Sequence, residues 1–166
     1  MKLQPASKLY LVIILCFTFS ANAQHSSNST SVYRNNTETD LSKMQKDILF
    51  YVNKHRKSIG LNELQMINEA SSEALGHSTD MSTGKTLVGH DGFDERIENI
   101  VKKIGFCMAS GENVAMGILT AEEVVNMWLN SPGHKRNIEG DFTITGIGIA
   151  KAANGYLYYT QIFLRK

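Results

Sequence analysis

The sequence contains little cysteine and little proline. Its 166 residues include two cysteines, Cys16 and Cys107, and two prolines. Cys16 lies in an N-terminal segment that we expect to be removed, so the mature chain would keep one thiol and could form no internal disulfide. Such a chain is not a disulfide scaffold of the kind common among small secreted proteins, and its fold must depend on the burial of apolar side chains.

The sequence also lacks an excess of charge of either sign. It has 17 basic and 16 acidic residues, and loss of residues 1–23 would remove two lysines and no acids. The remaining net charge, about −1, argues against binding to nucleic acid or to an anionic membrane surface. We therefore expect no nucleic-acid partner.

Residues 1–23 have the pattern of a secretory signal peptide. Two lysines precede an apolar run, residues 9–19, that is too short to cross a bilayer, and Ala21-Asn22-Ala23 forms a small-x-small cleavage site. A lipid-anchored form would need a small residue before Cys16, and Leu15 stands there. We expect cleavage after the last alanine, release as a secreted, extracellular or periplasmic protein, and no membrane span thereafter.

The mature chain is divided into a short polar leader and one domain. Residues 24–40 are rich in serine, asparagine and threonine, which predicts a disordered leader. Residues 41–166 are enough for one domain with a hydrophobic core. Within it, helical spacing of apolar side chains predicts helices over 41–57, 68–82 and 94–104, each followed closely by a glycine.

Two further helical segments meet near the single tryptophan. Thr120, with a glutamate three residues later, predicts a capping box that opens a helix containing Trp128 on its apolar face. Ser131 as N-cap and Pro132 at the first helical position then predict a new helical turn. We expect Trp128 to anchor the core beneath a cleft that includes His134.

The remaining segments have strand patterns. Residues 106–116 predict a strand or an extended loop, and residues 142–152 and 156–164 predict a β-hairpin joined by Asn154-Gly155, a two-residue turn signal. Two glycines inside the first hairpin strand indicate that a bulky group, an aromatic ring or a helix, packs closely there. Helices followed by paired strands favour the α+β class.

The five histidines lie in different surroundings. His25 belongs to the leader, and His55 lies at a helix end, where a cation favours the C-terminal dipole. His77 lies on the apolar face of its helix and is better interpreted as a packed, hydrogen-bonded core residue than as a ligand. His90 and His134 lie in polar turns beside glycines, which is where site residues are commonly mounted.

Glu112 is a carboxylate within an otherwise apolar stretch. It must face solvent or be paired, and a histidine is its natural partner. If His90, Glu112 and His134 converge, they form a set that suits Zn²⁺ or another divalent cation, or an acid/base cluster without a metal. Their spacing does not decide between these alternatives, because it matches no helical zinc motif.

Two motifs carry a resemblance to a known family. The run Trp128-Leu-Asn-Ser-Pro-Gly-His-Lys-Arg-Asn-Ile138, preceded by Gly111-Glu112-Asn113, resembles the bacterial branch of the CAP superfamily. This superfamily contains the SCP-like domains of cysteine-rich secretory proteins, antigen-five and pathogenesis-related proteins. The resemblance spans about residues 44–163 and rests on the order and spacing of the motifs. It implies an α-β-α sandwich, with a small antiparallel sheet between two helical layers.

The resemblance also implies a cleft lined by two histidines and two acids. His90, Glu112 and His134 match three of these positions and are the candidate catalytic residues, with the two histidines, and Glu112 as a third candidate, as ligands of a divalent cation. Ser131 stands where the eukaryotic pattern has its second acid. The tetrad is therefore incomplete.

Several neighbouring residues have both functional and structural interpretations. Asn113 and Asn137 could support the cleft or satisfy turn backbone. Ser131 near a histidine could be a nucleophile, but helix capping is the better interpretation because no nucleophile elbow surrounds it. Cys107 has apolar neighbours typical of an inert buried thiol. Trp128 is assigned to the core.

Three classes of function remain compatible with the sequence. The leading one is a secreted CAP-domain binding module whose cleft holds a divalent cation or a small polar ligand, or which meets an extracellular partner. The second is a cell-envelope hydrolase that uses the same cleft, and the third is a structural or adhesive domain. The sequence does not identify the ligand, because one fold hosts many roles.

Overall fold

The computed structural model describes residues 27–166, with side chains from Asp40 onward. The expected signal peptide, its cleavage site and His25 lie outside the described residues. The elements follow in the order α1 (Ser27–Ser58), β1 (Gln65–Met66), α2 (Asn68–Ser82), α3 (Phe93–Ile104), β2 (Ala109–Gly117), α4 (Ala121–Leu129), α5 (Pro132–Ile138), β3 (Ile144–Lys151) and β4 (Leu157–Arg165).

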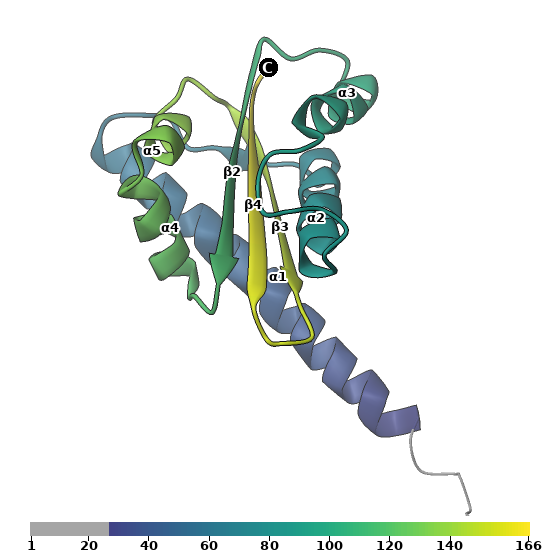
Figure 1. The fold of residues 1–166 in the computed structure, drawn as a ribbon. Helices are drawn as coiled ribbons and strands as arrows, with labels where there is room; N and C mark the ends of the chain where they lie inside the picture. Colours follow the sequence, from purple (N-terminus) through teal and green to yellow (C-terminus); the bar gives the residue numbers. More distant parts are fainter. Residues whose placement is uncertain (1–26) are drawn as a thin grey trace, which may run out of the picture.

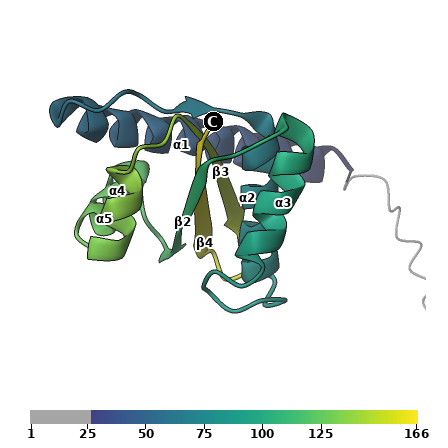
Figure 2. The same cartoon turned by 90° about the horizontal axis from the view of Figure 1, so that it is seen from above.

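The elements form three layers, as the resemblance predicts. The sheet lies in the middle, with α2 and α3 against one face and α1, α4 and α5 against the other (Figures 1 and 2). Each face buries its own apolar cluster, so the sheet is covered on both sides. The α+β class and the α-β-α sandwich are confirmed. Within residues 27–166, no helix is both long enough and apolar enough to cross a membrane.

The sheet is mixed rather than wholly antiparallel. Its strand order is β1-β3-β4-β2. The inner strand β4 pairs antiparallel with β2 on one side and with β3 on the other. The two-residue β1 pairs parallel with β3 at the opposite edge, through Gln65↔Ile144 and Met66↔Thr145. No pattern in the sequence predicts this strand, because two residues carry no periodicity.

The hairpin turn is one residue longer than the sequence suggests. The N–H of Ala152 donates to the carbonyl of Tyr156 at 2.8 Å, which leaves three residues in the loop, and Gly155 has a φ of 88°. A three-residue loop that ends in a left-handed residue is the next commonest hairpin connection after the two-residue turns. Glycine therefore supplies the backbone conformation, while Asn154 accepts from the N–H of Tyr156.

The first helix begins earlier than the sequence predicts. It extends from Ser27 to Ser58 and so includes residues 27–40, where we expected no regular structure. No glycine or proline occurs in this range, so nothing in the covalent chain ends the helix before Gly60. The side chain of Leu41, the first residue of the expected domain, packs against the core.

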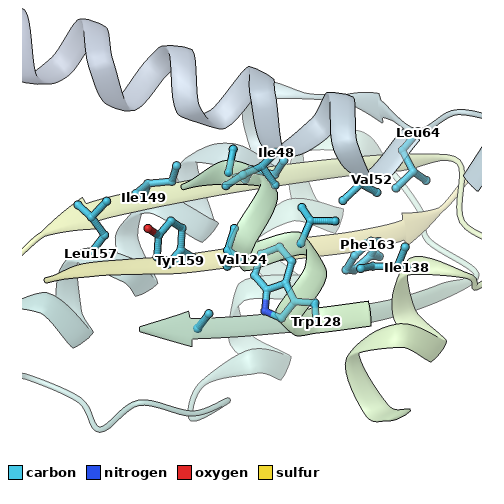
Figure 3. Close-up of a cluster of buried hydrophobic side chains, with 14 residues drawn as sticks. Ile48, Val52, Leu64, Val124, Trp128, Ile138, Ile149, Leu157, Tyr159 and Phe163 are labelled. Atoms are coloured by element: carbon cyan, nitrogen blue, oxygen red, sulfur yellow. The ribbon is translucent and has the colours of Figure 1, made fainter. Parts of the chain in front are cut away.

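The larger apolar cluster is centred on the tryptophan. Trp128 of α4 is fully buried in this cluster, which also contains Ile48, Val124 and Phe163 (Figure 3). Its indole N–H donates to the carbonyl of Val114 at 3.2 Å. The core assignment of Trp128 and the expected capping box of Thr120 are both confirmed.

The backbone of α2 packs directly against the backbone of β3, with no side chain between them at two glycines. A Cβ on Gly146 would overlap the backbone of α2 at Ala70, and a Cβ on Gly148 would overlap it at Ala74 and Leu75. The bulky group that the two glycines predicted is therefore a helix. The face of α2 expected from the periodicity is the buried one: Ala70, Ala74, His77, Ser78 and Met81.

Candidate functional site

The alternation of β2 directs neighbouring side chains to opposite layers. Glu112 lies opposite Ile162, which belongs to the cluster under α2 and α3. Asn113 lies opposite Gln161 and thus faces the layer of α1, α4 and α5. Because successive side chains of a strand point to opposite faces, β2 can connect groups from both helical layers at the edge of the sheet.

The carboxylate of Glu112 is buried and doubly paired. Its side chain is 2% exposed. Arg96 of α3 donates from Nε to Oε2 at 2.9 Å and from Nη2 to Oε1 at 2.8 Å, a bidentate pairing. Nδ1 of His90 lies 2.9 Å from Oε1. The expected histidine partner is confirmed, and the arginine is a site residue that the sequence reasoning missed.

The loop that carries His90 is fastened on both sides of it. Nε2 of His77 lies 2.8 Å from the carbonyl of Gly89, and Nη1 of Arg96 donates to the carbonyl of Asp91 at 2.7 Å. His77 is 4% exposed, which confirms its interpretation as a hydrogen-bonded core residue. These bonds hold the backbone of His90 while its side chain stays 53% exposed.

The contact with Glu112 selects one tautomer of His90. An ionised carboxylate only accepts hydrogen bonds, so Nδ1 of His90 must carry the proton in this contact. In the neutral imidazole the lone pair then lies on Nε2. A histidine with one nitrogen fixed by a carboxylate and the other free to accept is the arrangement seen around many metal and acid/base sites.

Two asparagines join the helix of His134 to β2. Asn113, fully buried, donates to the carbonyl of His134 at 3.1 Å. Asn137 donates to the carbonyl of Glu112 and to Oδ1 of Asn113, both at 2.9 Å. A Cβ on Gly111 would lie 2.9 Å from Oδ1 of Asn137, so this glycine leaves room for the contact. Both asparagines therefore fix α5 against the strand that carries Glu112.

His134 is half-buried and electrostatically coupled to His90. Burial, followed by the positive charge of a protonated His90, lowers the pKa of His134 from its ordinary value of 6.5. Both causes disfavour the charged imidazole. His134 is therefore held in the neutral form, which has a nitrogen lone pair to offer, to lower pH than a free histidine.

This coupling predicts the titration of His134. We expect an NMR-measured pKa below 6.5, and a partial increase in His90→Asn, because that substitution removes the smaller cause and leaves burial in place. Since the folded-state pKa is lowered, the stability contributed by neutral His134 is fully present above about pH 6.5 and is lost as pH falls through the folded-state pKa. If the pKa of His134 in the parent protein were 6.5 or higher, burial and the charge of His90 would not be lowering it.

The remaining candidate residues have structural roles. Ser131 occupies the N-cap of α5, with Pro132 as the first helical residue, but its side chain makes no capping hydrogen bond. His55, expected to favour the end of its helix, lies in the last turn of α1 and has Nε2 2.9 Å from Oε1 of Glu139. Cys107 is half-buried rather than buried, and its thiol donates to the carbonyl of Ala109 at 2.9 Å.

No three histidine, cysteine, aspartate or glutamate side chains within the described residues are grouped to hold a metal ion. Both oxygens of Glu112 accept from Arg96, and one of them also contacts His90, so the remaining candidate donors are the imidazoles of His90 and His134. Two imidazoles alone would need water to complete the coordination of a cation.

Fold and site together define an α-β-α sandwich with a histidine-bearing cluster at the edge of its sheet. Residues 49–163 match the cysteine-rich secretory protein family, CAP, over well over half of the chain. The chain belongs to this family.

The chain is also similar to curated relatives and to solved structures. The chain is 31% identical over 154 residues to the uncharacterized protein YkwD of Bacillus subtilis (strain 168), covering 88% of this chain and 54% of YkwD. It thus spans about half the length of that relative. An outer surface protein from Borrelia burgdorferi has the same fold, with a TM-score of 0.66 and 23% identity over 75% of this chain and 93% of that one. An extracellular SCP-domain protein from Bacillus anthracis str. Ames gives a TM-score of 0.59 and 27% identity over 75% of this chain and 41% of that one.

Proposed function

We propose that the chain is an extracellular binding module whose cleft holds a divalent cation or a small polar ligand between His90 and His134. The observation that carries the proposal is the contact between His90 Nδ1 and Glu112, which leaves Nε2 of His90 as an acceptor. The lowered pKa of His134 supplies a second neutral imidazole. Extracellular placement is supported by the description of the Bacillus anthracis relative as an extracellular protein and by the signal-peptide pattern.

Each residue has a distinct part in the proposed site. His90 and His134 would be the ligands, and a bound cation would supply a Lewis-acidic centre that attracts polar or anionic groups. Glu112 would orient His90 rather than coordinate, because Arg96 already engages both of its oxygens. Asn113 and Asn137 would keep His134 at a fixed position relative to Glu112.

Zinc titration followed by thermal unfolding tests this proposal. Zinc at about 100 times its dissociation constant should stabilise the protein by about 2.7 kcal/mol, and the effect should increase with pH because only neutral imidazole binds. His134→Ala should abolish the increment. Glu112→Gln should reduce it less if the carboxylate only orients His90.

His55→Ala is the matched control, because it removes a histidine far along the chain from the cleft residues and engaged with Glu139. Its melting temperature can fall, but its zinc increment should equal that of the parent protein. If zinc stabilised His134→Ala as much as the parent protein, or did not stabilise the parent protein at all, the cation site would be excluded. Polar ligands would then have to be tested without metal.

A further inference from the structure

A groove lies along the outer side of α1, separate from the histidine cluster. It has a volume of about 580 Å³ and is lined by residues of α1 and of the segment after it. Figure 2 shows this segment running back along the helix. Leu49 and Leu64 contribute apolar surface, and Phe50 is an exposed aromatic on the helix wall, with 60% of its surface accessible. Phe50 therefore offers an accessible aromatic surface to a group that lies in the groove.

The two walls of the groove are fastened to each other. Asn53 of α1 donates from Nδ2 to the carbonyl of Leu64 at 3.0 Å, and its Oδ1 accepts from the N–H of Leu64 at 2.8 Å. This closed pair of hydrogen bonds fixes the separation of the walls. The groove is therefore already formed in the free protein, which lowers the entropic cost of binding.

The charge of the groove is positive. Three lysines line it, Lys46, Lys54 and Lys57, against one acid, Glu63. Lys57 and Glu63 are 3.3 Å apart and neutralise each other. Lys46 and Lys54 form no ion pair with any other side chain in the described part of the chain. The unpaired charge of the groove is thus cationic, in a protein whose net charge is close to zero.

The spacing of these groups matches an extended peptide. Lys46, Phe50 and Lys54 follow one another at intervals of four residues, which is about 6 Å along a helix. Side chains on one face of an extended strand repeat every two residues, which is about 6.6 Å. We propose that the groove binds an extended acidic peptide segment with the pattern acid-x-aromatic-x-acid, whose carboxylates meet Lys46 and Lys54 and whose aromatic side chain packs on Phe50.

Fluorescence anisotropy with a dye-labelled peptide tests the inference on the full chain. The probe is Ser-Glu-Ser-Phe-Ser-Glu-Ser, and its binding should weaken as salt is added, because the charges are exposed. Lys46→Glu and Lys54→Glu should each weaken binding about tenfold, and Phe50→Ser should weaken it to a similar degree. All three side chains are exposed, so the variants should keep the fold, which circular dichroism can check.

Two controls make the outcome decisive. Lys102→Glu changes the same charge on the exposed surface of α3 and should leave binding unchanged. A peptide with glutamine in place of both glutamates should bind at least tenfold more weakly. Equal loss in Lys102→Glu, or equal binding of the glutamine peptide, would overturn the proposal. Binding to phosphatidylserine vesicles through Lys46 and Lys54, without binding to the peptide, would also overturn it and assign the surface to a membrane.

Discussion

Replacing Trp128 with alanine is expected to lower the free energy of unfolding by ~3–5 kcal/mol. The indole is fully buried in the larger cluster, which joins side chains of α1, α4 and the sheet (Figure 3). Its removal also leaves the carbonyl of Val114 without its indole donor. Because a domain of this size is stable by only ~5–15 kcal/mol, the loss would take a large share of the total.

Chemical denaturation followed by far-ultraviolet circular dichroism measures this effect. Fluorescence is unsuitable, since Trp128 is the single tryptophan of the chain. Trp128→Phe is the control: it keeps an aromatic ring but loses the N–H donor, and it should cost less than the alanine variant. An alanine variant that melts within a degree or two of the parent would show that α4 does not depend on this side chain.

Replacing Arg96 with methionine is expected to lower the free energy of unfolding by ~3–5 kcal/mol, because it leaves the buried carboxylate of Glu112 with only the imidazole of His90 as a side-chain partner. The same substitution removes the donor that holds the carbonyl of Asp91. The loop of His90 should therefore loosen, and its amides should exchange faster with solvent. Hydrogen exchange of the loop between α2 and α3 reports this second effect separately from global stability.

A second arginine provides a matched control. Arg165 forms an ion pair with Asp141 at 2.9 Å, but the two side chains are 45% and 77% exposed. Exposed pairs contribute ~0–1 kcal/mol, so Arg165→Met should change stability little. If both methionine variants lost the same free energy of unfolding, the loss would not be specific to Arg96. The buried carboxylate of Glu112 would then not depend on its arginine partner.

Local sequence signals were sufficient for most of the fold. The spacing of Ala70, Ala74 and Met81 identified both the helix and its buried face, because one helical stripe must face the sheet. The capping box at Thr120 fixed the start of α4 for a similarly local reason. Two strand glycines indicated that an aromatic ring or a helix packs closely there, and the structure identifies that group as α2.

Features that depend on distant parts of the chain were not predictable. The strand β1 exists only through its pairing with β3, which lies much further along the chain. The early start of α1 was missed because composition predicted disorder, whereas the absence of glycine and proline permits helix. Arg96 was missed although it precedes Ile100 by four residues and so shares its stripe; a charge at such a position needs a buried partner.

The hydrogen bonds that Trp128 and Asn137 donate to β2 bear on the solubility of the protein. β2 is the outermost strand on its side of the sheet, and its free carbonyls would otherwise be open to another chain. Side-chain N–H groups from α4 and α5 occupy the carbonyls of Val114 and Glu112. An incoming strand would have to compete with these donors while the helices stay docked. The docked α4 and α5 thus hinder intermolecular β-pairing at the edge of β2, which would otherwise favour aggregation.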